Sequence, residues 1–238
     1  MLESREFLDL ETLCRELDAS ESSIRRDLGI LEQQKIVKRV YGGAVLAQPG
    51  NSYGFDIAST HLGDEKSRIA KVAAGLVQER ETIVLDGGST VASVARELAA
   101  RSLHIVTNSL PIAETLQDAR NIELILTGGY LYPRLRVMLG PYSEQMLSTV
   151  RADRLIMGIG SISDSGFSNN NTLVVGSERK MLEIARQVII VADHTKFARG
   201  AMIPLAPLEA AHIVVSDNLL EPQYQDMLQK HGVQLLLA

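Results

Sequence analysis

The sequence contains a single cysteine, Cys14, and five histidines scattered along the chain. One cysteine excludes a disulfide within the chain and is compatible with a reducing cytoplasm, where we expect the protein to act. Because no Cys and His residues stand at metal-ligand spacing, we expect no metal site, and no motif calls for a cofactor. The histidines also lack a neighbouring nucleophile, so no catalytic pair is predicted.

Long apolar runs are missing as well. None approaches the roughly 20 residues that a membrane-spanning helix needs, and segment 1–11 is too acidic and too poor in apolar residues for a signal peptide. A hydrophobic content of 45% and a charged content of 22% are typical of a globular protein. With 238 residues, the chain can hold one large domain, or a small and a large one.

Positive charge is concentrated in one short segment. The net charge of −5 argues weakly against nucleic acid as the main partner, and residues 1–46 carry seven Lys and Arg against nine Asp and Glu. Residues 20–46, however, carry five Lys and Arg against three Asp and Glu. A local basic segment of this kind is a candidate electrostatic footprint for DNA.

The basic segment has the pattern of a helix-turn-helix followed by a β-wing. A first short helix has apolar residues at i, i+3, i+4 and i+7: Leu10, Leu13, Cys14 and Leu17. Ser20 is a good N-cap for a second helix, whose apolar face consists of Ile24, Leu28 and Leu31. Apolar and basic residues then alternate from Ile36 to Val45 around a Gly-Gly turn. We expect Cys14 to be a core residue.

In a helix-turn-helix the second helix enters the major groove, and a basic wing contacts phosphates. The candidate DNA contacts are Ser22, Ser23, Arg25, Arg26, Lys38, Arg39 and Tyr41. An exposed arginine pair on a helix is also compatible with a solvated surface, and the pattern alone leaves that alternative open.

The stretch from Thr82 to Ser109 predicts a βαβ unit in which both strands end in small polar residues. Gly87 and Gly88 let the backbone approach a ligand, and the next helix begins at Ser89 and Thr90 with unpaired N–H groups. This arrangement suits a phosphate. An ordinary strand-to-helix turn, with the serine as a cap, is the alternative.

Strands and helices alternate through the rest of the chain. Predicted strands are 122–126, 155–159, 188–192, 213–216 and 233–237; predicted helices are 65–78, 111–118, 142–149, 177–187 and 221–230. Such alternation favours an α/β domain, a mostly parallel sheet with helices on both faces. We therefore expect a DNA-binding module at 1–46, a Pro- and Gly-rich linker at 47–63 and a second domain at 64–238.

The N-terminal segment resembles the DNA-binding module of the DeoR family of bacterial repressors. The matching residues are Ser20, Ser23-Ile24-Arg25-Arg26-Asp27-Leu28 and Gly42-Gly43-Ala44. The chain departs from the family where it has Tyr41 for His and Ser23 for Thr, and both replacements keep a hydrogen-bonding group. The family module also begins with a full helix of which only residues 1–5 could represent the end, so we expect an N-terminally truncated winged helix-turn-helix.

Residues 64–217 are similar to the sensor domain of the same family. The matching motifs are Asp86-Gly87-Gly88-Ser89-Thr90, Thr107-Asn108-Ser109, Gly128-Gly129 with Gly140, and Asp193-His194-Thr195-Lys196-Phe197. The resemblance implies a fold similar to ribose-5-phosphate isomerase and a phosphorylated sugar as effector. The implied effector-binding residues are Asp86, Gly88, Ser89, Thr90, Asn108, Ser109, Gly129, Asp193 and Lys196.

The favoured hypothesis is therefore a repressor of a sugar-catabolism operon that a sugar phosphate releases from its double-stranded DNA operator. Twofold-related half-sites would require a homodimer or homotetramer. One alternative is a sugar-phosphate isomerase-like enzyme, with Asp86 or Asp193 as base and Lys196 as acid. Another is a sensor that no longer binds DNA because its first helix is absent.

Overall fold

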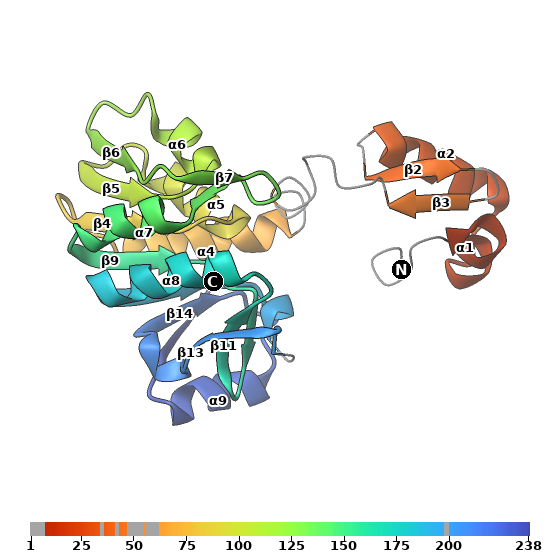
Figure 1. Ribbon diagram of the computed structural model, residues 1–238. Coiled ribbons are helices and arrows are strands. Elements are labelled where there is room, and N and C mark those ends of the chain that lie inside the picture. Colours follow the sequence, from red (N-terminus) through yellow and green to blue (C-terminus); the bar gives the residue numbers. More distant parts are fainter. Residues whose placement is uncertain (1–7, 34–35, 41–42, 47–54, 56–61, 198–199) are drawn as a thin grey trace. The chain divides into compact units, whose positions relative to one another are not determined.

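The computed structural model of the chain describes residues 8–33, 36–40, 43–46, 55, 62–197 and 200–238 (Figure 1). Its internal contacts divide the chain into two compact units, Met1–Ile57 and Ala58–Ala238. Each unit has its own hydrophobic core, and the two are described separately. Most of the predicted linker lies outside the described residues.

Two helices form the helix-turn-helix, α1 (Leu10–Glu16) and α2 (Glu21–Gln33). The Oγ atom of Ser20 accepts a hydrogen bond of 3.2 Å from the N–H of Ser23, which confirms Ser20 as the N-cap of α2. Asp18, between the helices, has a φ of 48° and turns the chain.

A three-stranded antiparallel sheet completes the module, in the order β1 (Leu8–Asp9), β3 (Gly43–Leu46), β2 (Val37–Val40). The β2–β3 hairpin is the predicted wing. Strand β1, which pairs Leu8 with Ala44, has no counterpart in the sequence-based prediction. The predicted remnant of a first helix and Tyr41 lie outside the described residues.

The core of the module is small. It consists of Leu13, Ile24, Leu28, Val37 and Ala44, with Cys14 half-buried against it, as predicted. The prediction for Leu17 is wrong: this side chain is 53% exposed. Helix α1 ends at Glu16, so the helical periodicity that would place Leu17 on the apolar face stops one residue earlier.

The second unit is built on a seven-stranded sheet in the order β15-β14-β12-β9-β4-β5-β6. All neighbouring strands in this sheet are parallel. The strands are β4 (Thr82–Leu85), β5 (Leu103–Thr107), β6 (Ile122–Leu126), β9 (Ala152–Met157), β12 (Ala185–Val191), β14 (Ile213–Ser216) and β15 (Gln234–Leu237). The parallel sheet is as the alternation of elements predicts.

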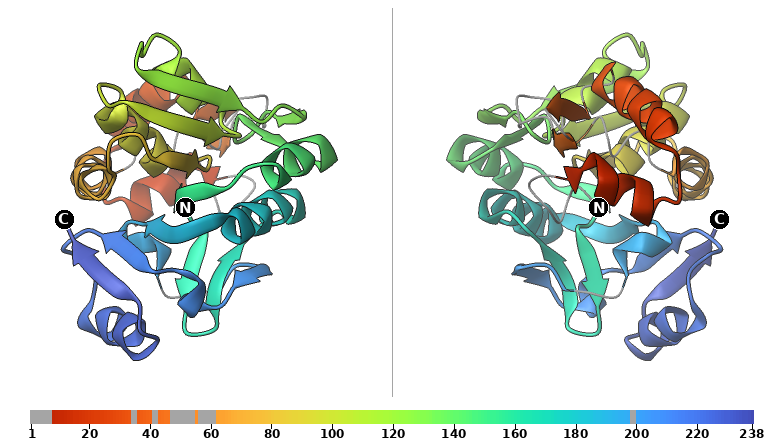
Figure 2. Two further views of the ribbon diagram at one scale, coloured as in Figure 1. Left: turned by 90° about the vertical axis from the view of Figure 1, so that its left-hand side faces the viewer. Right: turned by 90° about the vertical axis from the view of Figure 1, so that its right-hand side faces the viewer.

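Helices cover both faces of this sheet, which also agrees with the prediction. The helices are α4 (Gly63–Gly75), α5 (Ser89–Leu98), α6 (Leu110–Leu116), α7 (Pro141–Ser148), α8 (Thr172–Ile184) and α9 (Pro222–Lys230). Helices α4 and α5 pack together on one face, whereas α7 and α8 pack together on the other (Figures 1 and 2). Two small antiparallel sheets lie beside them, one formed by β7 (Tyr130–Tyr132) and β8 (Val137–Leu139), the other by β10 (Ser161–Ser163), β11 (Gly166–Asn169) and β13 (Ile203–Ala206).

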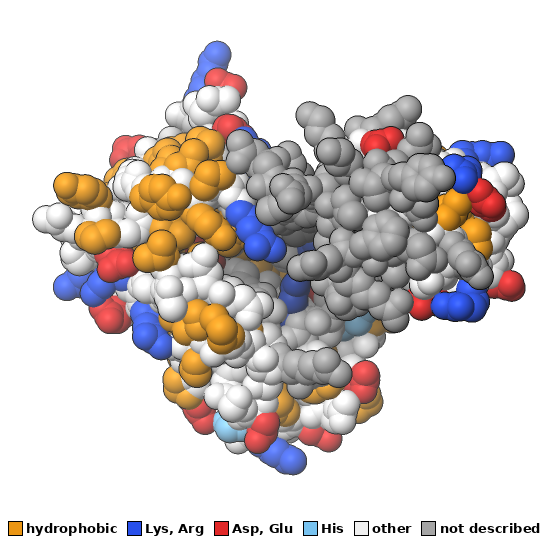
Figure 3. All heavy atoms as spheres, turned by 45° about the vertical axis from the view of Figure 1, so that its right-hand side comes forward, with side chains coloured by type: hydrophobic (Ala, Val, Ile, Leu, Met, Phe, Trp, Pro, Cys, Tyr) orange, Lys and Arg blue, Asp and Glu red, His pale blue; other side chains and the backbone are white. Residues whose placement is uncertain are grey.

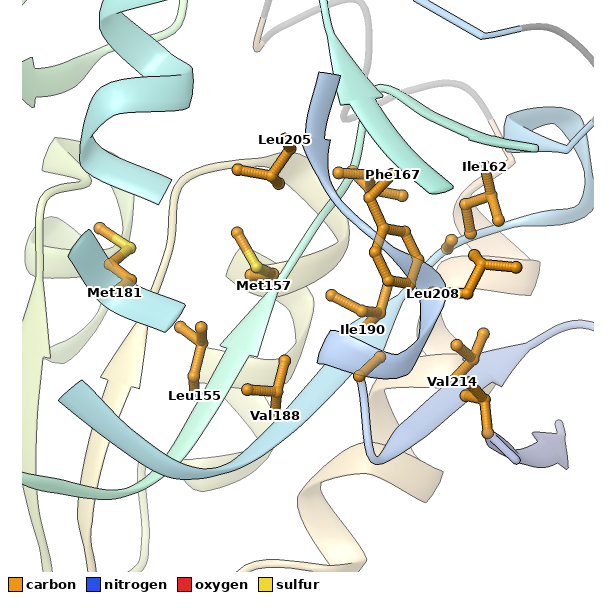
Figure 4. Close-up of a cluster of buried hydrophobic side chains, with 14 of the residues drawn as sticks. Leu155, Met157, Ile162, Phe167, Met181, Val188, Ile190, Leu205, Leu208 and Val214 are labelled. Carbon is orange, nitrogen blue, oxygen red and sulfur yellow. The ribbon is translucent and has the colours of Figure 1, made fainter. Parts of the chain in front are cut away.

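The core under α8 is drawn in Figure 4. Leu155 and Met157 of β9 point to the same side, as do Val188 and Ile190 of β12, because successive strand residues alternate between faces. Met181 of α8 packs against them. This packing holds α8 against β9 and β12.

Several helices and strands begin or end at other residues than the sequence-based prediction gives, and α8 is the clearest case. Helix α8 begins five residues earlier than predicted because Asn171 caps it, accepting from the N–H groups of Leu173 and Val174. Strand β6 is the edge of the sheet, and Ile125 on it is 45% exposed; Figure 3 shows exposed hydrophobic side chains on this unit. The sheet is therefore incompletely covered at that edge.

Candidate functional site

Strand order reverses between β4 and β9. From β4 the sheet grows through β5 to β6, whereas from β9 it grows the other way through β12. The carboxyl edge at such a reversal is the usual ligand crevice of an open α/β sheet. Asp86 follows β4 at this point, and its N–H bonds to the carbonyl of Ile156 in β9 at 3.1 Å.

The loop after Asp86 requires both of its glycines. A Cβ on Gly87 would lie 2.3 Å from Cγ1 of Val137, and Gly88 has a φ of 129° with open space beside it. Gly88 is the N-cap of α5, and within this described stretch no side chain caps the helix and no acidic residue stands in its first turn. Half-buried Ser89 and buried Thr90 follow. The start of α5 can therefore accept an anion.

Asn108 and Ser109 follow β5, the strand next to β4. Both are buried, and neither Oδ1 of Asn108 nor Oγ of Ser109 has a hydrogen-bond partner among the described residues. The main chain of this loop is well held: the N–H of Met138 bonds to the carbonyl of Asn108 at 2.6 Å, and the hydroxyl of Thr107 accepts from the N–H of Ser109 at 3.0 Å. A loop whose main chain is held by hydrogen bonds and whose side-chain acceptors and donors have no partner suits a polar ligand.

A second carboxylate, Glu178 of α8, lies close to Asp86. Its Oε1 accepts from Nδ2 of Asn169 at 2.8 Å, whereas its buried Oε2 has no partner in the described chain. Burial raises the pKa of Asp86 to about 7, against hydrogen bonds from the Gly87 N–H and the Asn108 side chain. Burial first, and then the charge of Asp86, raise the pKa of Glu178 to about 8.

The loop after β12 brings Asp193 and Lys196 to the same edge of the sheet. Buried Asp193 caps a short helix, η1 (His194–Lys196), by accepting from the N–H of Thr195 at 3.1 Å. Fully buried Asp217, after β14, binds His194 twice, at Nδ1 (2.9 Å) and at the main-chain N–H (2.8 Å). His194 is thus an anchor of this loop.

Lys196 is half-buried and lines a cavity of about 480 Å³ together with Thr195, Gly160 and Ser161. Within the described residues Lys196 forms no ion pair with Asp193. The amine of Lys196 is therefore available to a ligand.

Lys66 is a residue that the sequence-based prediction missed. It lies on α4, is only 5% exposed, and its pKa is lowered by burial first, with Asp193 raising it and Lys196 lowering it again. Lys66 therefore joins Lys196 and Asp193 at the carboxyl edge. The signal was present: Lys66 precedes Ile69 and Ala70 by three and four residues, a lysine on the buried face of the helix.

Gly129, which lies between β6 and β7, is the predicted site residue that close packing explains. It has a φ of 110°, and a Cβ there would lie 2.8 Å from the carbonyl oxygen of Leu139 and 3.3 Å from Ser143. Close packing of the β7–β8 hairpin explains this glycine, and its contact with an effector stays a prediction.

Five buried side-chain atoms of the described residues have no hydrogen-bond partner: Asn108 Oδ1, Ser109 Oγ, Ser177 Oγ, Glu178 Oε2 and Ser216 Oγ. They lie in loops after β5, at the end of β14 and on α8. Unsatisfied polar atoms are costly in a folded protein and are expected where a ligand or water completes them. In the same part of the chain, no group of His, Cys, Asp and Glu has the arrangement of a metal site.

The candidate DNA contacts on α2 lie mostly at the surface. Ser22, Arg25 and Arg26 are exposed, and Ser23 is half-buried. Arg25 forms an ion pair of 2.7 Å with Glu21, so it would have to leave that partner to bind a phosphate. Arg26 has no ion pair within the described module. Lys38 and Arg39 belong to β2, opposite Val45 and Ala44.

Among the described residues, no helix has the length and apolar character needed to cross a bilayer. Two family models match the chain: one described as the DeoR C terminal sensor domain, over residues 62–218, and one described as the DeoR-like helix-turn-helix domain, over residues 1–49. Together they span both compact units.

The curated relatives that match the whole chain include two repressors. It is 31% identical over 240 residues to the HTH-type transcriptional repressor GlcR of Bacillus subtilis (strain 168), covering 100% of this chain and 92% of the relative. It is 32% identical over 241 residues to the glycerol-3-phosphate regulon repressor of Escherichia coli (strain K12), covering 100% and 95%. A solved D-ribose-5-phosphate isomerase in complex with phospho-erythronic acid is 16% identical, with a TM-score of 0.43, covering 57% of this chain and 54% of that chain.

Proposed function

The chain belongs to the DeoR family of transcriptional regulators, and we propose on that premise that it represses a sugar-catabolism operon and leaves its operator when a phosphorylated sugar binds. The observation that carries the effector half of this proposal is the set of unsatisfied buried polar atoms at the carboxyl edge of the sheet. The observation that supports the DNA half is the helix-turn-helix with an exposed arginine on α2.

In the proposed complex, the N–H groups and hydroxyls at Gly88, Ser89 and Thr90 hold the phosphoryl group, and Lys196 supplies positive charge. The buried amine of Lys66 adds a second cation nearby. Sugar hydroxyls meet polar side chains at the ends of the strands: Asp86, Asn108, Ser109 and Asp193.

On the DNA side, α2 enters the major groove. Ser22, Ser23, Arg25 and Arg26 contact DNA there, and the wing places Lys38, Arg39 and Tyr41 against phosphates. Twofold-related half-sites then require at least a homodimer, or a homotetramer. If the effector and the operator favour different subunit arrangements, each lowers the affinity for the other by the same factor.

The domain boundaries that we propose are 1–46 for the DNA-binding module, 47–63 for the linker and 64–238 for the sensor domain. The break between the two compact units, after Ile57, falls in that linker and supports these limits. We place the protein in the cytoplasm, where its operator would be.

A regulator is favoured over an isomerase-like enzyme because the relatives that match the whole chain are named repressors. The remaining alternative is a sensor without DNA binding. Capture of genomic DNA fragments at low salt separates it from the repressor: the repressor enriches a defined fragment, and a sensor without DNA binding enriches none.

The effector is tested in two steps. Thermal shift with pentose and hexose phosphates, and with the same sugars lacking phosphate, identifies ligands, since a ligand of the folded state raises the melting temperature. Fluorescence anisotropy with the enriched DNA fragment then measures release. Lys196→Met should abolish the response, whereas Lys230→Met, on α9, should retain it. Unchanged DNA affinity with every phosphorylated sugar would refute the proposal.

A further inference from the structure

Two buried hydrogen-bond acceptors of the site, Oε2 of Glu178 and Oδ1 of Asn108, have no donor among the described residues. Glu178 is 2% exposed and uses one oxygen on Asn169, which leaves Oε2 unpaired. Asp86 and Oδ1 of Asn108 lie at the same edge, and both residues are buried. An unsatisfied acceptor at such depth is completed by a group that donates.

The cations of the site lie elsewhere. Lys66 interacts with Asp193 and Lys196, and neither Asp86 nor Glu178 is among the charges that shift its pKa. Conversely, the pKa of Asp86 is shifted by burial, the Gly87 N–H and Asn108, and that of Glu178 by burial, Asp86 and Asn169, with no cation in either set. The site therefore has a basic part, at Lys66 and Lys196, and an acidic part, at Asp86 and Glu178.

We propose that Asp86 and Glu178 receive a neutral, hydroxyl-bearing part of the effector, so that the sensor accepts phosphorylated sugars and polyols and rejects phosphorylated sugar acids. This inference rests on the proposed function, because it assumes that a phosphoryl group binds at the start of α5. A hydroxyl donates to Oε2 of Glu178 and to Asp86. A carboxylate on the ligand has no proton to donate. Once the pH exceeds the pKa values of both Asp86 and Glu178, it also adds a third negative charge beside two buried carboxylates.

Matched ligands test this inference directly. Ribitol 5-phosphate and ribonate 5-phosphate differ only in a terminal hydroxymethyl or carboxylate group, as do glucitol 6-phosphate and gluconate 6-phosphate. Titration calorimetry at pH 8.5 should give an affinity at least tenfold higher for the polyol of a pair. Glu178→Gln should narrow that ratio at least threefold. Glu183→Gln, the same change on an exposed side chain of α8, should leave it unchanged.

The outcomes separate the two proposals. Equal binding of the polyol and the acid by the full-length protein would overturn the acidic-pair inference and leave the effector proposal standing. An unchanged ratio in Glu178→Gln would do the same. If none of the four ligands binds, and inorganic phosphate does not bind either, the start of α5 is not a phosphate site and both proposals fail.

Discussion

The two units of the chain use polar residues in opposite ways. In the DNA-binding module, the candidate DNA contacts on α2 lie mostly at the surface, and the described part of the core has five buried residues. In the sensor domain, the polar residues of interest are buried at the edge of a seven-stranded sheet. The surface of the module therefore suits a large partner such as DNA, whereas the buried side-chain atoms without hydrogen-bond partners in the sensor suit a small ligand.

This difference predicts which substitutions damage which unit. A module with so small a core has little stability to lose, so core truncation should disable it first. The sensor has a much larger core, so it should tolerate changes at its polar edge and show them mainly in ligand binding and in its response to pH.

The largest effect is expected from Leu28→Ala, in the core of the module. Removal of a buried leucine side chain costs about 2–5 kcal/mol, which should unfold the module and abolish DNA binding. The sensor should still show its thermal shift with effector. Ile30→Ala, an exposed change on the same helix, is the control. Equal loss of effector binding in Leu28→Ala would contradict the independence of the two units.

The next largest effect is expected from Arg26→Ala. Loss of one phosphate contact should weaken DNA binding about tenfold. It should also lower, by about one, the slope of the logarithm of the binding constant against the logarithm of the salt concentration. Anisotropy titrations between low and moderate salt measure both quantities. Arg151→Ala removes an exposed arginine of the sensor domain and should change neither. An Arg26→Ala protein with an unaltered salt slope would exclude a phosphate contact at this position.

A smaller effect concerns pH. The pKa of Asp86 is raised from 3.8 to about 7 and that of Glu178 from 4.5 to about 8, so the folded state binds protons more tightly than the unfolded one. The ligand-free sensor should therefore lose stability as the pH rises from about 4 to about 8, the range in which the unfolded chain is ionised and the folded carboxyls are still protonated. Calorimetry measures the melting temperature of both proteins at pH 6 and pH 8.5. The melting temperature of Glu178→Gln relative to the wild type should be at least about 2 °C higher at pH 8.5 than at pH 6. If the melting temperatures of Glu178→Gln and the wild type changed equally with pH, the Asp86 and Glu178 carboxylates would not repel each other.

The smallest effect is expected from Leu17→Ala. The i, i+3, i+4, i+7 spacing predicts Leu17 on the apolar face of the first helix, but α1 ends at Glu16 and the Leu17 side chain is 53% exposed. Truncation should change the free energy of unfolding by no more than about 0.5 kcal/mol, whereas Leu13→Ala should cost several times more. Chemical denaturation of both variants measures this. Similar costs for the two would mean that Leu17 is packed in solution.

Much of the fold could be predicted from the sequence because its signals are local. Apolar runs such as Ile122–Leu126 match their strand, and Ser20 marks the start of α2. The start of α8 was missed because its cap, Asn171, follows two other asparagines and precedes no clear apolar period. Strand β1 was missed because it has two residues and exists only through pairing with β3.

The candidate site was predictable only in part. Asp86, Asn108 and Asp193 each follow a buried strand, so their shared edge could be inferred. Strand order could not be, and it is the reversal between β4 and β9 that places Asp86 in the crevice. Lys66 comes from α4, and although its position on the buried face follows from the helical period, its approach to the edge depends on helix packing that no local pattern encodes.

The double attachment of His194 to Asp217 has a consequence for how an effector would be recognised. Because the ring and the main chain of His194 are both held, the turn that carries Lys196 keeps its shape before any ligand arrives. A preorganised turn loses little conformational entropy on binding. Weakening this anchor should therefore reduce the affinity for effector although neither residue touches it.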